Sequence, residues 1–117
     1  MIESLLERIN KFHPLSAELT ERISSVTKFV TYQAGDFILK EGQVCNKACL
    51  VIKGLARSYY INEDKDITSR FMDEGFIITS WISYYTQQPG NEFIEALEET
   101  TLTCISYAAI QKMYIDF

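Results

Sequence analysis

The spacing of apolar and polar residues divides the chain into a helical start, a long middle made of strands and a helical end. At the start, apolar residues recur every three or four positions, which predicts an amphipathic helix over about residues 2–12. The apolar face of this helix consists of Ile2, Leu5, Leu6, Ile9 and Phe12. His13-Pro14 should end it, because the residue before a proline avoids the α region. Ser16 is the expected N-cap of a second helix, whose apolar face carries Leu19, Ile23 and Val26.

From Lys28 onward the pattern changes to short runs rich in β-branched and aromatic residues. The expected strands cover residues 29–32, 37–39, 49–52, 55–61, 66–72, 93–97 and 102–107. Gly35, Gly42 and Gly54 lie at corners between the early runs, where a residue without Cβ turns the chain easily. Corners spaced about 8–12 residues apart favour a β-sandwich, a jelly roll or a barrel.

Three local features refine this middle part. The polar residues 62–65 predict a hairpin turn, slightly longer than the tightest type, between the fourth and fifth runs. Alternation along the fifth run places Thr68, Arg70 and Met72 on one face of its strand. After a corner at 73–76, a short helix is expected over about residues 80–85, with Thr79 or Ser80 as its N-cap.

The end of the chain predicts another amphipathic helix. Ser106 is its expected N-cap, and its apolar stripe consists of Ile110, Met113, Tyr114 and Phe117. The chain stops inside this stripe, without the glycine or proline that commonly follows a helix. We therefore expect the sequence to be either a truncated gene product or a piece of a longer protein, and we expect this helix to mediate weak self-association.

Composition excludes several classes of protein. A chain of 117 residues is one domain, and 11 basic against 16 acidic residues give a net charge of −5, which disfavours nucleic-acid binding by this chain alone. No apolar run is long enough to span a membrane and no signal peptide is visible, so we expect a cytoplasmic protein. No nucleophile elbow, P-loop or dinucleotide fingerprint is present, and no catalytic residue or enzymatic activity is expected.

The cysteines and the single histidine do not form a metal-binding pattern. Cys45, Cys49 and Cys104 contain no second close pair, and His13 is distant from them in sequence. We expect no metal site, and we expect the three cysteines to be reduced thiols with packing roles.

Two glycine-containing segments resemble a known family. Gly35-Asp-x-Ile38-x-x-x-Gly42 and Leu50-x-Ile52-x-Gly54-x-x-x-x-Tyr59 are similar to the signature of cyclic-nucleotide-binding domains. The closer likeness is to the sensory domain of the cyclic-AMP receptor family of bacterial transcription regulators. This resemblance implies a mainly β fold with flanking helices, a double-stranded β-helix of the jelly-roll type.

The resemblance also implies an organisation for the chain. Residues 1–117 form one domain, with N-terminal helices over 1–27, the β-roll over 28–107 and the start of the C-terminal helix over 108–117. In the family this helix leads into a dimerisation helix and a helix-turn-helix DNA reader, which are absent from this chain. The implied partners are therefore a second copy, as a homodimer, and DNA only through the missing domain. No membrane partner is implied.

In this family, a cassette of roughly Phe-Gly-Glu-Leu, followed later by Arg-Ser/Thr-Ala, holds the cyclic nucleotide. Here Ile78 stands in place of the glycine and Thr79 in place of the glutamate, and the second motif falls near Gly90-Asn91-Glu92 with its arginine missing. We therefore expect no cofactor and no binding of cyclic AMP or cyclic GMP, while the identity of any other small ligand stays open. The candidate pocket residues are Arg70, Ile78, Thr79, Ser80, Trp81, Asn91 and Glu92.

Several of these residues have two readings. Arg70 either holds an anion or pairs with Glu92 inside the roll, or it is a solvated strand arginine, and Arg57 offers the same choice. The aromatic cluster of Trp81, Tyr84 and Tyr85 either stacks on a ring-shaped ligand or packs the core or an interface.

Two functions follow from these observations. The first is the effector-sensing and dimerisation domain of a regulator similar to the cyclic-AMP receptor family, with a degenerate nucleotide site. The alternative is a stand-alone β-roll interaction module with no small-molecule ligand. A reading frame that continues after Phe117 into a helix-turn-helix would favour the first, and a stop codon at that point would favour the second.

Overall fold

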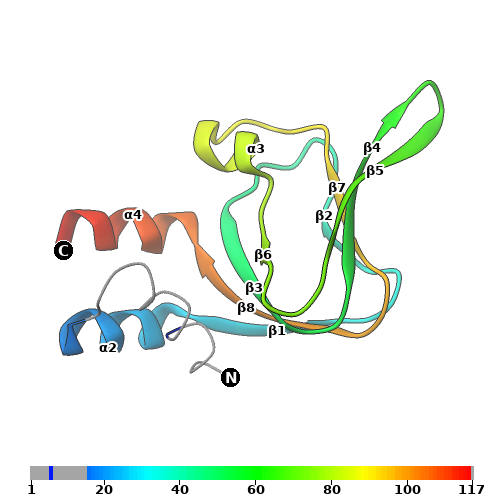
Figure 1. The fold of residues 1–117 in the computed structure, drawn as a ribbon. Helices are drawn as coiled ribbons and strands as arrows, with labels where there is room; N and C mark the ends of the chain where they lie inside the picture. The colour runs from blue at the N-terminus through cyan, green and yellow to red at the C-terminus, as the bar shows by residue number, and fades with distance from the viewer. Residues whose placement is uncertain (1–5, 7–15, 117) are drawn as a thin grey trace.

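The computed structural model describes residue 6 and residues 16–116 of the chain, and two antiparallel β-sheets facing each other make up most of it (Figure 1). The first sheet has the strand order β1-β8-β3-β6. Its strands are β1 (Lys28–Tyr32), β8 (Thr100–Ser106), β3 (Lys47–Lys53) and β6 (Ile77–Ile78). The mainly β jelly-roll fold with flanking helices that the sequence predicts is confirmed.

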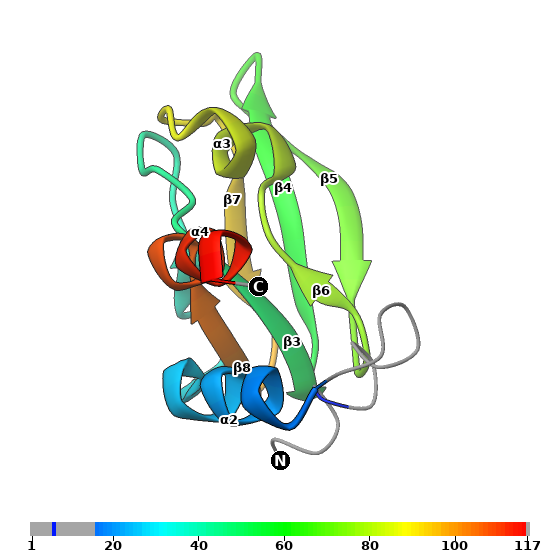
Figure 2. The ribbon, with the colours of Figure 1, turned by 90° about the vertical axis from the view of Figure 1, so that its left-hand side faces the viewer.

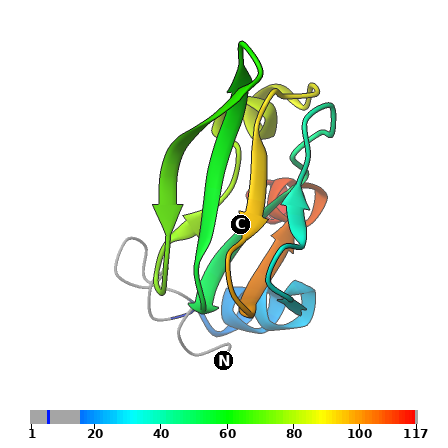
Figure 3. The ribbon, with the colours of Figure 1, turned by 90° about the vertical axis from the view of Figure 1, so that its right-hand side faces the viewer.

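The second sheet has the strand order β2-β7-β4-β5, and Figure 3 shows it from its outer face. Its strands are β2 (Phe37–Leu39), β7 (Phe93–Ala96), β4 (Ala56–Asn62) and β5 (Lys65–Met72). Nearly every run predicted as a strand is therefore a strand, although β8 begins at Thr100, two residues before the expected start. Apart from the hairpin of β4 and β5, successive strands lie in different sheets, so both sheets depend on each other for their buried faces.

The main core lies between the two sheets. Its fully buried members include Val51 and Leu102 from the first sheet and Met72 and Ile94 from the second, each at most 1% exposed. These residues alternate with outward-facing ones along their strands, as strands covered on one face require.

Two helices cover the outer face of the first sheet (Figure 2). α2 (Ala17–Val26) and α4 (Tyr107–Asp116) pack around a second cluster centred on Ile23, Leu50 and Ile105. The clustered apolar residues that pack around this centre include Leu6, Leu19, Val26, Ile110 and Met113.

The predicted caps of both helices are confirmed. The Leu19 backbone N–H donates to the Ser16 hydroxyl at 3.1 Å, and the Ala109 N–H donates to the Ser106 hydroxyl at 3.1 Å. The rest of the predicted helix over residues 2–12, its end at His13-Pro14 and residue Phe117 lie outside the described residues.

The hairpin between β4 and β5 differs from the sequence prediction in two ways. Asn62 pairs directly with Lys65, and the two residues between them have φ values of 53° and 63°, so the turn has the tightest length rather than a longer one. The pairing register also shifts between Ser58 and Tyr59, which pair with Arg70 and Thr68. This bulge interrupts the alternation, so Thr68 does not share the inner face with Arg70 and Met72 as predicted.

The prediction of three reduced thiols is wrong for two of the cysteines. Cys49 on β3 and Cys104 on β8 are partners in the antiparallel register and form a disulfide, while Cys45 is a free, buried thiol. The two residues lie 55 positions apart in sequence, and only the strand pairing brings them together. No helix of the described chain is long and apolar enough to cross a membrane.

Candidate functional site

Four predicted site residues gather around a cavity at the end of the roll. α3 (Trp81–Thr86) and the loop after it form one side of this cavity, and β5 forms the other. The cavity has a volume of about 490 Å³, and we call it the cassette cavity. Arg70, Ser80, Asn91 and Glu92 line it, together with small polar and apolar residues of α3 and its loop.

The other two predicted residues whose side chains are described, Ile78 and Thr79, line a different cavity. It has a volume of about 450 Å³ and lies among residues of β2, β3, β6 and β7, and we call it the roll cavity. Ile38, Cys49 and Ile94 contribute to its wall, and all three belong to the main core between the sheets. The sequence thus predicts residues of two neighbouring cavities as though they formed one.

Arg70 lies on the inner face of the roll and binds the chain itself. On β5 it pairs with Ser58, and its guanidinium donates to the backbone carbonyl of Thr79 at 2.5 Å. This bond fixes the segment between β6 and α3. Arg70 is therefore neither fully solvated nor ion-paired with Glu92 within the described residues, although both line the cassette cavity.

Cys45, which was not among the residues predicted for the site, holds the beginning of α3. The Ser80 backbone N–H donates to the Cys45 sulfur at 3.4 Å, and that sulfur lies 3.2 Å from the Thr79 hydroxyl oxygen. The Cys45 N–H in turn donates to the Ser83 hydroxyl at 2.9 Å. Ser80 does occupy the N-cap position of α3, but its side chain makes no capping bond. The Ser80 N–H could otherwise donate to an anion at the beginning of α3, but it is already bonded within the chain.

The aromatic residues of α3 divide between the core and the surface. Tyr84 is buried in the main core, and its ring meets the ring of Tyr107 edge-on at a centroid distance of 5.2 Å. Tyr85 is 72% exposed, with its ring 5.7 Å from that of Tyr84. Trp81 begins α3, and its side chain lies outside the described part of the structure. For Tyr84 the core-packing reading is therefore the one that the structure supports.

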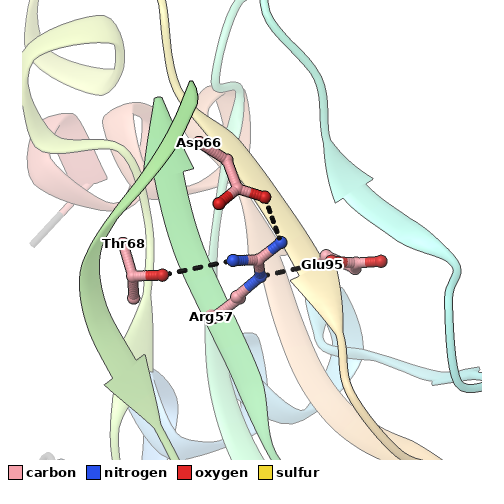
Figure 4. Close-up of polar contacts among 4 residues, drawn as sticks. All are labelled: Arg57, Asp66, Thr68 and Glu95. Carbon is pink, nitrogen blue, oxygen red and sulfur yellow. Dashed lines mark hydrogen bonds and ion pairs between the residues drawn. The ribbon is translucent and has the colours of Figure 1, made fainter. Parts of the chain in front are cut away.

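Arg57 lies on the outer face of the second sheet, away from both cavities (Figure 4). Its guanidinium donates to the Asp66 carboxylate at 3.1 Å, to the Glu95 carboxylate at 3.3 Å and to the Thr68 hydroxyl at 3.2 Å. It also lies over the Tyr59 ring, 4.1 Å from the ring centroid. The hydrogen bond to Asp66 raises the pKa of Arg57, as does the one to Glu95, against the lowering effect of burial. Arg57 therefore joins three strands of this sheet and is not an anion site.

One buried hydroxyl lies on the inner face between the two cavities. Ser58 is 0% exposed, and its hydroxyl has no hydrogen-bond partner among the described residues. Its register partners are Ile94 of the roll cavity on one side and Arg70 of the cassette cavity on the other. Directly paired residues in a sheet point to the same face. A polar group is thus left unsatisfied on the inner wall, where buried groups normally have partners.

Comparison with known proteins adds a family model and a set of similar folds. Residues 29–116 match the family model described as the cyclic nucleotide-binding domain. No curated protein matches the chain in sequence.

The catabolite activator protein of Thermus thermophilus has a TM-score of 0.72 at 20% identity, over 86% of this chain and 47% of that one. The N-terminal domain of a transcriptional regulator from Streptomyces coelicolor A3(2) has a TM-score of 0.73 at 20% identity, over 86% and 72%. The CO-dependent transcription factor CooA from Carboxydothermus hydrogenoformans has a TM-score of 0.66 at 24% identity, over 97% and 45%. The chain thus spans less than half the length of the Thermus and Carboxydothermus proteins.

Proposed function

The chain belongs to the family of cyclic nucleotide-binding domains, and we propose from this that it is the effector-sensing and dimerisation domain of a transcription regulator similar to the cyclic-AMP receptor family. Its own cyclic nucleotide site is degenerate in this proposal. The domain is not an enzyme, acts in the cytoplasm, and reaches DNA only through a separate domain of the whole regulator.

The proposal of a degenerate site rests on the charged and hydrogen-bonding groups that line the cassette cavity. A cyclic phosphate needs a free cation and free N–H donors. Here one of the five Arg70 N–H groups donates to the Thr79 carbonyl, which holds the guanidinium against the segment before α3, and the Ser80 N–H already donates to the Cys45 sulfur. Glu92 adds a carboxylate to the same cavity, which would repel the phosphate.

The expected loss of affinity can be estimated. A hydrogen bond to a charged group contributes about 1.5–3 kcal/mol, so losing the family's arginine alone costs roughly 10- to 150-fold in affinity. The missing glutamate and the added carboxylate of Glu92 weaken binding further. Cyclic AMP and cyclic GMP should therefore bind at least roughly 10- to 150-fold more weakly than they bind a domain that keeps the family's arginine.

Isothermal titration of the purified chain with cyclic AMP and cyclic GMP tests this proposal. We expect no saturable heat at micromolar concentrations from the wild type. A double variant, Gly90→Arg with Glu92→Ala, restores a cation and removes the carboxylate, so it should bind more tightly than the wild type. A micromolar dissociation constant for either nucleotide in the wild type would contradict the degenerate site.

A specific observation also supports the alternative of an interaction module. The outer face of the second sheet exposes several large apolar side chains around Arg57, among them Phe37 (37% exposed) and Phe71 (59% exposed). Exposed aromatic groups beside an arginine are common in protein interfaces. In the first proposal this surface would face other parts of the regulator, and in the alternative it would be the main binding surface.

A further inference from the structure

The roll cavity differs from the cassette cavity in the chemistry of its walls. Five of its lining residues, Ile38, Leu39, Cys49, Ile78 and Ile94, are apolar members of the main core and are at most 8% exposed. They come from four strands in both sheets, so the cavity opens into the inside of the roll. A cavity of about 450 Å³ whose walls combine apolar core residues with polar ones is within the usual range of small-molecule sites.

The rim of the roll cavity is polar and carries one charge. Among the described residues that line it, Lys47 alone is formally charged, and Gln43 and Asn46 add amide groups. The Lys47 ammonium donates to the Tyr32 hydroxyl at 3.0 Å, and Tyr32 packs against the main core. An ammonium has three N–H donors, so this contact leaves two for a ligand. None of the described residues that line this cavity is acidic.

We propose that the roll cavity binds a small amphipathic monocarboxylate, with its aliphatic chain inside the roll and its carboxylate at Lys47. This inference rests on the proposed function, since it names the class of effector that the domain senses. The apolar walls match an aliphatic chain, and the single cation without neighbouring acids matches one carboxylate.

The walls of the roll cavity also connect it to α3. Cys45 and Thr79 line the cavity, and the Cys45 sulfur accepts the N–H of Ser80 at the beginning of α3. The Thr79 carbonyl accepts the bond from Arg70 of the cassette cavity. A ligand that displaces Cys45 or Thr79 would therefore move the beginning of α3, the helix that forms one side of the cassette cavity.

Titration calorimetry with butanoate, hexanoate, octanoate and decanoate tests the proposal. Each buried methylene contributes about 0.8 kcal/mol, so affinity should rise roughly 15-fold for each added pair of methylenes until the cavity is full. Alcohols of the same lengths share the aliphatic chain but lack the charge. They should show the same length dependence at lower affinity.

Two variants locate the site. Lys47→Met should weaken the carboxylates about tenfold and leave the alcohols unchanged, because a charged hydrogen bond is lost. Lys53→Met, at the exposed far end of the same strand, is the matched control and should change neither series. Val44→Trp adds bulk to a half-buried position of the cavity wall and should block both series. Circular dichroism checks that each variant is folded.

Four outcomes would overturn the inference. They are no binding of any carboxylate by the wild type, no dependence of affinity on chain length, equal effects of Lys47→Met and Lys53→Met, and unchanged binding in a folded Val44→Trp variant. These failures are separate from failure of the proposed function, which the cyclic nucleotide titration decides. A wild type that binds cyclic AMP tightly contradicts the degenerate site whatever the carboxylates do, and a wild type that binds neither class contradicts only the present inference.

Discussion

A substitution at Gly54 should separate two reasons for having glycine at the corners of the roll. Gly54 has a φ of +117°, and a Cβ built on it would lie 2.6 Å from the Thr100 Cα and 2.7 Å from the Glu99 carbonyl oxygen. Both atoms belong to the backbone and have little freedom to move aside. Gly35 has a φ of +90°, but a Cβ there would meet nothing within 4 Å. Gly35→Ala is therefore a matched control that carries the backbone cost without the collision.

The magnitude follows from the groups involved. A non-glycine residue in such a backbone conformation costs about 1–3 kcal/mol, which both variants should show. In Gly54→Ala the collision also displaces Thr100, which is fully buried and whose hydroxyl bonds the Leu55 N–H at 3.2 Å and the Glu98 carbonyl at 2.9 Å. Disturbing such buried bonds adds about 1–3 kcal/mol. We expect Gly54→Ala to lose roughly 2–6 kcal/mol in total.

Urea unfolding followed by circular dichroism measures the difference. With a slope of about 2 kcal/mol per molar urea, the midpoint of Gly54→Ala should fall by roughly 2 M, and that of Gly35→Ala by about 1 M. The slopes should stay the same, since the folded surface is unchanged. Equal losses in the two variants would refute the reasoning, because the close approach to Thr100 would then have no cost of its own.

Two further predictions concern covalent and quaternary structure. The double variant Cys49→Ala with Cys104→Ala should lose about 4 kcal/mol of stability in urea, the chain-entropy value for a loop of this length, and a variant as stable as the oxidised wild type would contradict the disulfide's role. Self-association through α4 stays a prediction from the sequence. Sedimentation equilibrium should detect a weak dimer that Met113→Glu dissociates and Met113→Leu preserves, and a wild type that stays monomeric at high concentration would rule it out.

The fold could be predicted because its signals are local. Each strand is a short run of β-branched and aromatic residues, and the capping roles of Ser16 and Ser106 depend on residues only three positions away. The boundaries of the roll follow from these signals together with the glycine corners. Such features need no knowledge of which strand pairs with which.

The candidate site was harder to predict because it depends on pairing between distant segments. The bulge opposite Ser58 places Thr68 and Arg70 on different faces of the sheet, and the sequence of β5 contains no signal that predicts this bulge. The partnership of Cys45 with Thr79 and Ser80 joins positions more than thirty residues apart. The family motifs selected Ile78 and Thr79, which precede α3 in the chain, but these motifs could not assign the two residues to a second cavity.

The Cys49–Cys104 bond also changes how tension would pass along the chain. It closes a covalent ring that contains β4, β5, β6, α3 and β7, while α2, β1, β2 and α4 lie on the two arms outside it. A force applied at the two ends would run from β3 through the sulfur atoms into β8 and α4. The chain between the two cysteines, which lie 55 positions apart and could be about 190 Å apart in an extended chain, lies off this covalent path. Tension on α4 would therefore reach α3 through packing, as in the contact between the Tyr107 and Tyr84 rings, and not through the backbone of the covalent ring.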